Sequence, residues 1–465
     1  MYKHLSKHCV MKNATFRVLV IVSITIFLFQ SCSSDDNFDD IEVDPRATTD
    51  LIMEWNDLWL EVDRYAYGMR PTSTSRALAY IHLAGYETAV PEMEGYTSNI
   101  NRLQGLTIDA AQQAGTINLN LALNTCYALV FDHFMVNVST AVDAQIGTLK
   151  SVNEAELSEG LSTSEIENSI AWGTYVANMV IAYSQTDTAA EEQMWDPQPL
   201  SYEPPVGEGY WTYSDDPERA LFPYWGEVRT FVISPDETTS VAPSIPYSSD
   251  PNSDFFEAMH EVYTVSTTAK IEDNEDLWIA EFWSDDVEGL MMSPPGRTIS
   301  LANQLIDQHD LEYDRALAML LKLGFSLNDA AVSAWADKYE YMVMRPSVYI
   351  KEHIDPNFET NLYRFISWPD PSFPGYPSGH STFASAAAGI FIDEFGDAMD
   401  FTDRTHEGRT EFRGAPRTYS AISTMVEELA FSRLPLGVHM KMDCEEGYRL
   451  GYEISDAVLN FNLSN

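Results

Sequence analysis

Apolar residues recur every three or four positions along most of this chain, the spacing that places them on one face of an α-helix. Few stretches alternate apolar and polar residues as a half-exposed strand would. The pattern therefore predicts an all-α fold. The predicted helices span residues 48–68, 74–92, 108–150, 164–184, 252–270, 296–309, 313–342, 380–396, 417–431 and 439–461.

One long stretch departs from this pattern. Residues 186–250 are dense in Pro, Trp, Tyr and acidic side chains, and this aromatic content argues against a free disordered segment. We interpret the stretch as an ordered insertion packed on the helices, which either forms the mouth of a site or covers helix ends. The chain is then predicted as a single domain over 48–465, with an N-terminal bundle over 48–185 and a C-terminal bundle over 251–465.

The N-terminal end carries an export pattern. Residues 18–29 form an apolar run of 12 residues that follows basic residues and is too short to span a bilayer. The run is followed by Cys32 and an acidic stretch, which resembles a bacterial lipoprotein signal with Cys32 as the lipidated residue. We expect a signal peptide over 1–31, an acidic tether over 32–47 and a lipid anchor in the cell envelope of a Gram-negative bacterium. An ordinary cleaved signal peptide is the alternative.

The net charge limits the binding partners of the chain, and the cysteine count bears on its thiols. The net charge of −44 argues against nucleic acid, and against an anionic membrane surface as an electrostatic partner, which leaves the lipid anchor as the only expected membrane contact. With 45% hydrophobic residues the chain is globular. Cys9 and Cys32 belong to the leader region, and we expect Cys126 and Cys444 to be free, buried thiols, with a disulfide between them as the alternative. Against so acidic a background, any cluster of cations calls for an anionic ligand.

Lys338 and Arg345 form the first of three blocks with candidate chemistry. They are seven residues apart, about two helical turns, so they fall on one face of a helix that Ser326 or Asn328 can cap. Pro346 disfavours helical geometry at the residue before it, which predicts that this helix ends near Arg345. Two cations on one stripe repel each other unless an anion lies between them. A solvated basic face is the alternative, and it is weaker in a chain so poor in Lys and Arg.

The second block predicts a helix start. Ser378 is a good N-cap, and strong helix formers follow it. The N–H groups of Gly379 and His380 in the first turn then have no intrahelical acceptor, and the helix dipole favours negative charge there. The imidazole of His380 can exchange a proton with a bound oxygen near neutral pH. A capped helix with an incidental histidine is the alternative.

The third block contains a histidine and a carboxylate four residues apart. On a helix the Asp443 carboxylate can accept the Nδ1–H of His439, which leaves Nε2 unprotonated and aimed. Arg433 lies six residues before His439, so a continuous helix would separate their faces. Pro435 and Gly437 between them indicate that the helix breaks and restarts, which would let both side chains converge. An ordinary surface His–Asp pair is the alternative.

Together the three blocks resemble the signature of the vanadium-dependent haloperoxidase and type 2 phosphatidic acid phosphatase superfamily. The family pattern is Lys-x6-Arg-Pro, Pro-Ser-Gly-His and Ser-Arg-x3-Gly-x-His-x3-Asp, and the chain matches all of it in order and spacing between about Trp335 and Asp443. The resemblance implies two packed helical bundles. Weaker likeness to bacterial haloperoxidase-type proteins lies upstream, at Trp55, residues 76–82, residues 279–283 and residues 294–297.

The resemblance implies a vanadate cofactor, whose site phosphate can also occupy. In this reading the equatorial oxygens of the anion are neutralised by Lys338, Arg345 and Arg433. The Ser378 hydroxyl and the Gly379 N–H assist them.

The resemblance also implies the catalytic roles. His439 would be the axial vanadium ligand in a peroxidase, or the phosphorylated nucleophile in a phosphatase. His380 would be the general acid and base, Asp443 would orient His439, and Lys338 would polarise the bound peroxide.

Three features favour the peroxidase over the soluble acid phosphatase of the same superfamily. Trp335 and Phe373 occupy positions similar to the aromatic wall on the halide side of haloperoxidases, although ordinary core packing is the commoner fate of Trp and Phe. The chain is also far longer than a minimal phosphatase of this type. We therefore expect oxidation of iodide or bromide by hydrogen peroxide, with a small organic acceptor. A non-catalytic anion binder is the third alternative, which the complete set of site residues argues against.

Overall fold

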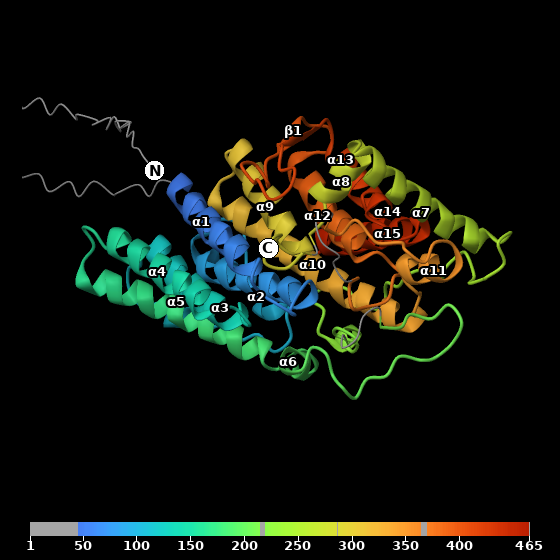
Figure 1. The fold of residues 1–465 in the computed structure, drawn as a ribbon. Helices are drawn as coiled ribbons and strands as arrows, with labels where there is room; N and C mark the ends of the chain where they lie inside the picture. Colours follow the sequence, from blue (N-terminus) through green and yellow to red (C-terminus); the bar gives the residue numbers. More distant parts are fainter. Residues whose placement is uncertain (1–44, 214–218, 286, 364–369, 465) are drawn as a thin grey trace, which may run out of the picture. The chain divides into compact units, whose positions relative to one another are not determined.

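The computed structural model describes residues 45–213, 219–285, 287–363 and 370–464 (Figure 1). The predicted signal peptide, Cys32 and most of the predicted tether lie outside these residues. The first helix begins at Pro45, so the last three residues of the predicted tether belong to it. Proline is favoured in the first turn of a helix because its ring fixes a helical φ and the missing N–H has no partner there.

The described residues are mostly helical, with one short strand pair, which confirms the predicted all-α helical-bundle fold. In chain order the elements are α1 (Pro45–Asp63), α2 (Thr72–Ala89), η1 (Val90–Glu92), η2 (Asn99–Asn101), η3 (Ala110–Gln112), α3 (Leu119–Phe134), α4 (Thr140–Leu157), α5 (Thr163–Ser184), α6 (Thr188–Trp195), η4 (Trp225–Glu227), α7 (Asp254–Glu272), α8 (Glu275–Phe282), α9 (Pro294–Gln308), α10 (Tyr313–Tyr341), α11 (Pro346–His353), α12 (Gly379–Phe395), β1 (Phe401–Asp403), β2 (Arg417–Tyr419), α13 (Ile422–Phe431), α14 (Arg433–Leu436) and α15 (Lys441–Leu459).

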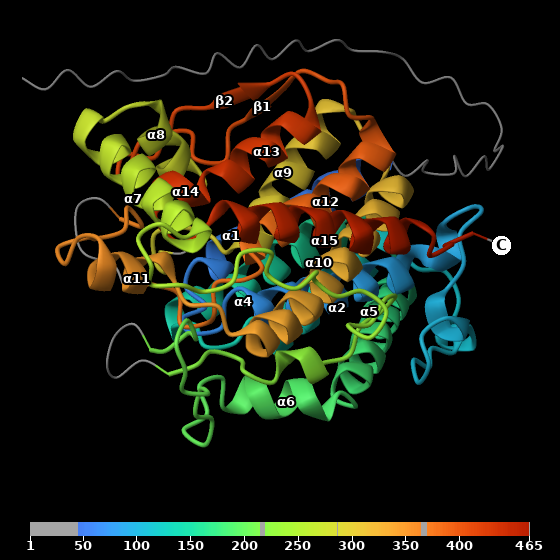
Figure 2. The same cartoon turned by 90° about the vertical axis from the view of Figure 1, so that its right-hand side faces the viewer.

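Helix α10 joins two groups of helices. On one side it packs against α2, which packs with α3 and α5, while α4 lies on α3; on the other it packs against α12 and α15 (Figure 1). One hydrophobic core cluster runs through both groups. Among the described helices only α10 is long and apolar enough to cross a membrane, and 94% of its apolar window is buried, as in the core helix of a globular fold. The only strand pair of the described residues, antiparallel β1–β2, lies beside α13 (Figure 2).

Several predicted helix boundaries are wrong. The single helix predicted over 108–150 is two helices, because Asn118 caps α3 and Ser139 caps α4, with a loop between them. Part of the helix predicted over 417–431 is strand β2. The pattern also missed α6, α8 and α11, which have eight residues each, too few for a helical period to be distinguished.

The insertion is ordered where it is described, and it packs on α10 and on the loop before α12. Trp211 and Trp225 are buried, and their segments run along the C-terminal half of α10. The backbone N–H of Trp211 donates to the carbonyl of Met342 just beyond α10 (2.6 Å), and that of Leu221 donates to the carbonyl of Ser372 (2.9 Å). The insertion therefore covers the end of α10 and also reaches the chain that leads into the second block.

Helices α12 and α15 pack so closely that their contact requires glycine. A Cβ at Gly451 would clash with the Thr382 carbonyl oxygen and with Ser385 Oγ. We expect Gly451→Ala to lower the free energy of unfolding by about 1–3 kcal/mol, because the two helices must move apart. Gly147→Ala in α4 is the control: a Cβ there meets no atom within 4 Å, so it should raise the free energy by roughly 0.5–1 kcal/mol. Urea denaturation measures both, and similar values for the two variants would contradict the predicted clash.

Candidate active site

The first block lies at the C-terminal end of α10, although not as one helix. Helix α10 ends at Tyr341 because Met342 adopts a left-handed conformation with φ of 51°. Arg345 then stands in extended conformation as the N-cap of α11, four residues beyond the end of α10, so the prediction that Lys338 and Arg345 share one helical face is wrong. Ser326 and Asn328 lie inside α10 and cap nothing, since the helix begins at Tyr313. A turn at Met342 thus takes the place of the predicted continuous helix. Both cations still lie near the Phe373 ring, with Lys338 Nζ at 5.3 Å and Arg345 Cζ at 5.1 Å from its centroid.

The second block begins α12 as predicted. The Ser378 hydroxyl accepts the N–H of Ser381 at 3.4 Å, which is the geometry of an N-cap. Gly379 and His380 follow in the first turn and are both buried. Ser378 is fully buried as well, but its side chain serves the helix start and does not line the cavity described below.

In the third block the helix is interrupted as predicted, but the next helix begins later than predicted. Gly437 closes the short helix α14 with φ of 89°, and α15 begins only at Lys441. His439 therefore precedes the helix, which corrects its predicted place on one. The pairing with Asp443 holds regardless: His439 Nδ1 lies 3.2 Å from Asp443 Oδ2, which also accepts the N–H of Met440 at 3.0 Å.

These contacts fix the protonation of His439. Arg345 Nη1 lies 3.1 Å from His439 Nε2, and a guanidinium can only donate. Nε2 therefore carries the lone pair, and the proton is on Nδ1, facing the carboxylate of Asp443. Burial, together with the charges of Arg345 and Lys338, lowers the pKa of His439 well below its usual range. The imidazole is neutral and suited to act as a ligand or nucleophile.

One small cavity collects side chains from all three blocks. Its apolar wall includes Trp335 and Phe373, whose ring centroids lie 4.7 Å apart. Lys338, Ser378 and Asp443 stand behind this lining. Sequence reasoning missed Pro71, Pro371 and Phe383. Phe383 lies one turn after His380 in α12, whereas no local spacing connects Pro71 to the three blocks. The lining residues are Pro71, Trp335, Arg345, Pro371, Phe373, Gly379, His380, Phe383, Arg433 and His439.

Lys338 is held by backbone carbonyls next to this cavity. Its ammonium donates to the carbonyl of Pro374 at 3.0 Å, to that of Gly375 at 3.2 Å, and to that of Pro377. Desolvation and the charges of Arg345 and Arg433 lower the pKa of Lys338 well below its usual value.

The two arginines are anchored in the same way. Arg345 donates to the carbonyls of Phe373 at 3.0 Å and Val438 at 3.1 Å, and Arg433 donates to the carbonyl of Trp283 at 3.2 Å. Both guanidinium groups are buried, at 0% and 1% exposure.

The charges suit an oxoanion rather than a metal cation. Two buried guanidinium groups and the first-turn N–H groups of α12 face the cavity, and a buried ammonium lies behind it. Among the described residues, no group of three or more His, Cys, Asp or Glu side chains could hold a metal ion. Vanadate or phosphate would balance the cations and bring oxygens to the donors, so this donor set fits either anion.

Burial raises the pKa of Asp443 to about 6 from the ordinary 3.8. Because this pKa is higher in the folded protein than in the unfolded chain, the carboxyl stabilises the fold most at a pH below the pKa of the unfolded chain. That contribution is lost as the pH rises from about 4 to 6. We expect Asp443→Asn to remove this dependence and to increase the free energy of unfolding at pH 7 by up to about 3 kcal/mol. Urea denaturation at pH 4, 5, 6 and 7 measures the effect. An unchanged slope in the variant would show that another group titrates.

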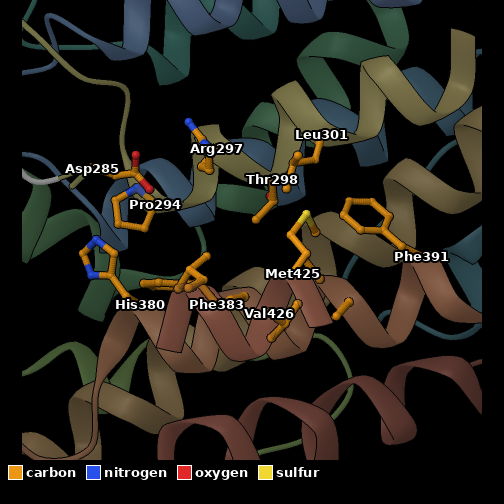
Figure 3. Close-up of a pocket in the computed structure, with 14 residues that line it drawn as sticks. Asp285, Pro294, Arg297, Thr298, Leu301, His380, Phe383, Phe391, Met425 and Val426 are labelled. Atoms are coloured by element: carbon orange, nitrogen blue, oxygen red, sulfur yellow. The ribbon is translucent and has the colours of Figure 1, made fainter. Parts of the chain in front are cut away.

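A second, mostly apolar cavity adjoins the first. It lies between α9, α12 and α13, and both cavities are lined by His380 and Phe383. Figure 3 shows Asp285 and His380 at the same end of this second cavity. Asp285 is 1% exposed and stands 95 positions before His380 in the chain, which is why sequence reasoning missed it.

The predicted thiols are confirmed: Cys126 and Cys444 are free and buried. Cys444 follows Asp443 in α15, and burial raises the pKa of both cysteines to about 12. Neither thiol is a nucleophile at neutral pH.

Comparison with known proteins yields haloperoxidases. Residues 318–464 match the family model described as the VCPO second helical-bundle domain. The vanadium chloroperoxidase of Curvularia inaequalis is 20% identical over 403 residues, covering 74% of this chain and 66% of that protein. The vanadium-dependent bromoperoxidase of Ascophyllum nodosum is 31% identical over 120 residues, covering 23% of this chain and 22% of that protein. The chain thus spans less than two thirds of the length of these curated relatives.

Two solved structures share the fold. A bacterial vanadium-dependent iodoperoxidase superposes with a TM-score of 0.79 at 24% identity, covering 92% of this chain and 99% of that one. The holo-type structure of a bacterial vanadium-dependent chloroperoxidase superposes with a TM-score of 0.62 at 16% identity, covering 85% and 92%.

Proposed function

We propose that the chain belongs to the vanadium haloperoxidase superfamily and that it is a vanadate-dependent haloperoxidase, which oxidises iodide or bromide with hydrogen peroxide to hypohalous-acid equivalents. The observation that carries the proposal is the cavity in which Arg345, Arg433, His380 and His439 meet beside an aromatic wall. A small organic molecule would accept the oxidised halide.

The cationic side chains would hold the oxoanion. Arg345 donates to His439 Nε2, and its guanidinium would instead donate to an oxygen of a bound anion, which would leave Nε2 available as a ligand. Arg433 and the Gly379 N–H would take further oxygens, while Lys338 adds positive charge from behind the lining. Bound vanadate would supply a Lewis acid that activates peroxide without changing oxidation state.

The remaining residues move protons and admit the halide. His380 lines the cavity at the start of α12, where its imidazole would take a proton from incoming peroxide and return one to a leaving oxygen. Asp443 keeps the Nδ1 proton of His439 in place. The Trp335–Phe373 wall would exclude water from the side by which a halide approaches.

The leader pattern supports a location for this reaction. We infer that Cys32 is lipidated after removal of residues 1–31 and that the protein is anchored in the cell envelope of a Gram-negative bacterium. The apolar run ending before Cys32 supports this inference. Metabolic labelling with a clickable fatty acid tests it, with Cys32→Ser as the variant that should lose the label.

The activity is tested by reconstitution. Vanadate is added to the apo-protein, and peroxide-dependent halogenation of a phenolic dye is followed with iodide, bromide and chloride. We expect turnover with iodide or bromide only after vanadate addition; no turnover with any halide rejects the proposal. Phosphate release from a small ester, inhibited by vanadate and lost in His439→Ala, would instead support the phosphatase alternative. Anion binding with neither reaction would identify a non-catalytic binder.

A further inference from the structure

One short segment of the insertion touches three of the chain segments that carry or support the anion site. Residues 239–241 contact α10, the loop before α12, and α15. All of these contacts lie outside the cavity, since no residue of the segment lines it. Any effect of the segment on the anion site is therefore exerted through the positions of other residues.

The contact with α10 consists of hydrogen bonds that a buried carboxylate of the helix accepts from residues 239 and 240. Asp337, at 1% exposure, accepts the Thr239 hydroxyl at 2.5 Å and the Ser240 N–H at 2.7 Å. The Ser240 carbonyl in turn accepts the hydroxyl of Tyr341 from the last turn of α10, at 3.0 Å. The next residue along the helix from Asp337 is Lys338.

The contact with the loop closes a ring of hydrogen bonds. The Tyr376 hydroxyl donates to the Val241 carbonyl, while the ammonium of Lys338 donates to the carbonyls of Gly375 and Pro377, which flank Tyr376 in the same short loop. The ring runs from Lys338 through this loop to Val241 and returns to the helix through Asp337. It fixes the path of the chain into Ser378 and the first turn of α12.

The contact with α15 lies one turn beyond the carboxylate that orients His439. The Val241 N–H donates to Glu446 Oε1 at 2.7 Å, and Arg449 Nη2 donates to the Thr239 carbonyl at 3.0 Å. Glu446 is three residues after Asp443 on the same helix.

We propose that residues 239–241 are a positioning clamp, in which Asp337 and Tyr376 set the distance between the Lys338 end of α10 and the first turn of α12, and Glu446 sets that of α15. Neither Asp337 nor Tyr376 lines the anion cavity, so both are positioning residues. The cations and N–H groups of the site bind a tetrahedral anion only when the distances between them are kept. Residues that hold such binding groups in place typically change the affinity by about 10–100-fold when they are replaced. The proposal rests on the proposed function only in requiring that this site bind an oxoanion.

The chain offers a matched control on the same helix. Asp329, eight residues before Asp337 and at 0% exposure, accepts the backbone N–H groups of residues 231, 232 and 233 at 2.8, 2.8 and 3.0 Å. It pins the same insertion to α10 with equal burial, about two turns from Lys338. For Tyr376 the control is Tyr86, whose hydroxyl donates to the Thr97 carbonyl at 3.0 Å in the N-terminal group of helices.

The experiment measures the Kd of vanadate by calorimetry on the full chain, with thermal unfolding recorded for each variant. We expect Asp337→Asn and Tyr376→Phe to weaken vanadate binding by about 10–100-fold, and Asp329→Asn and Tyr86→Phe to stay within about twofold of the wild type at comparable losses of stability. The Asp337→Asn/Tyr376→Phe double variant should bind only as weakly as the weaker single variant, because both changes open one ring.

Tyr376→Phe removes one hydroxyl and decides the question even where Asp337→Asn does not fold. Equal vanadate affinity in Tyr376→Phe and Tyr86→Phe overturns the clamp while leaving the proposed function intact. Independent, multiplicative losses in the double variant also overturn the ring. A wild-type protein that binds no vanadate overturns the clamp and the proposed function together.

Discussion

His439→Ala is expected to abolish vanadate-dependent halide oxidation, lowering kcat/KM by roughly 10³-fold or more. His439 Nε2 faces the cavity with its lone pair, because Arg345 donates to that atom and Asp443 faces Nδ1. In the described residues His380 is the only other imidazole lining this cavity, and it belongs to another helix. Reconstitution with vanadate, followed by the dye assay and by calorimetry, measures both turnover and anion affinity.

The control for this variant is His82→Ala. His82 is also fully buried, and it belongs to α2 and lines neither cavity next to His380. It should lose stability but keep its kcat/KM at temperatures where it is folded. If His439→Ala retained more than a tenth of the wild-type activity, the vanadium ligand would have to be another group.

Arg345→Ala should produce the second large effect, on anion affinity rather than on the chemical step. The arginine is wholly buried, and its guanidinium connects the Phe373 carbonyl, the Val438 carbonyl and His439. Loss of one partner of a buried, hydrogen-bonded charge pair costs on the order of 2–5 kcal/mol, which is about 30-fold to several thousandfold in the Kd of vanadate. Calorimetry gives the Kd directly.

One further variant separates the charge of Arg345 from its geometry, and another is the control for removal of an arginine. Arg345→Lys keeps the charge but not the planar fork, so its affinity should lie between those of the wild type and Arg345→Ala. Arg315→Ala removes an exposed arginine paired with Glu394 and should leave the Kd within about twofold. A Kd for Arg345→Ala within threefold of the wild type would mean that the anion lies elsewhere.

Much of the fold could be predicted because burial imposes a repeat on the sequence. The long helices show it clearly: α5, predicted over 164–184, spans Thr163–Ser184, and α10, predicted over 313–342, spans Tyr313–Tyr341. The N-cap role of Ser378 could be predicted from its side chain, because a hydroxyl just before a run of helix formers can accept a free N–H of the first turn. Short helices such as α8 and α11 left no readable period.

The site residues were identifiable, but their local geometry was not. The spacing of Lys338 and Arg345 is compatible with one helical face, yet Met342 ends the helix by adopting a left-handed conformation that residue type did not indicate. His439 precedes α15, and its pairing with Asp443 survives because the carboxylate near the start of the helix reaches back to both the imidazole and the Met440 N–H. Local spacing restricts such choices, and long-range packing selects among them.

The sequence by itself determined the chemistry of this protein: which cations, imidazoles and first-turn N–H groups are available, and that an acidic chain gathers them for an anion. Only the tertiary structure decided how they meet. It placed Arg345 against His439, brought Pro71 and Asp285 to cavities that adjoin His380, and fastened residues 239–241 of the insertion across α10 and α15. The physical reason is that side-chain chemistry is a property of each residue, whereas convergence depends on contacts between segments about 100 or more positions apart, which no local pattern encodes.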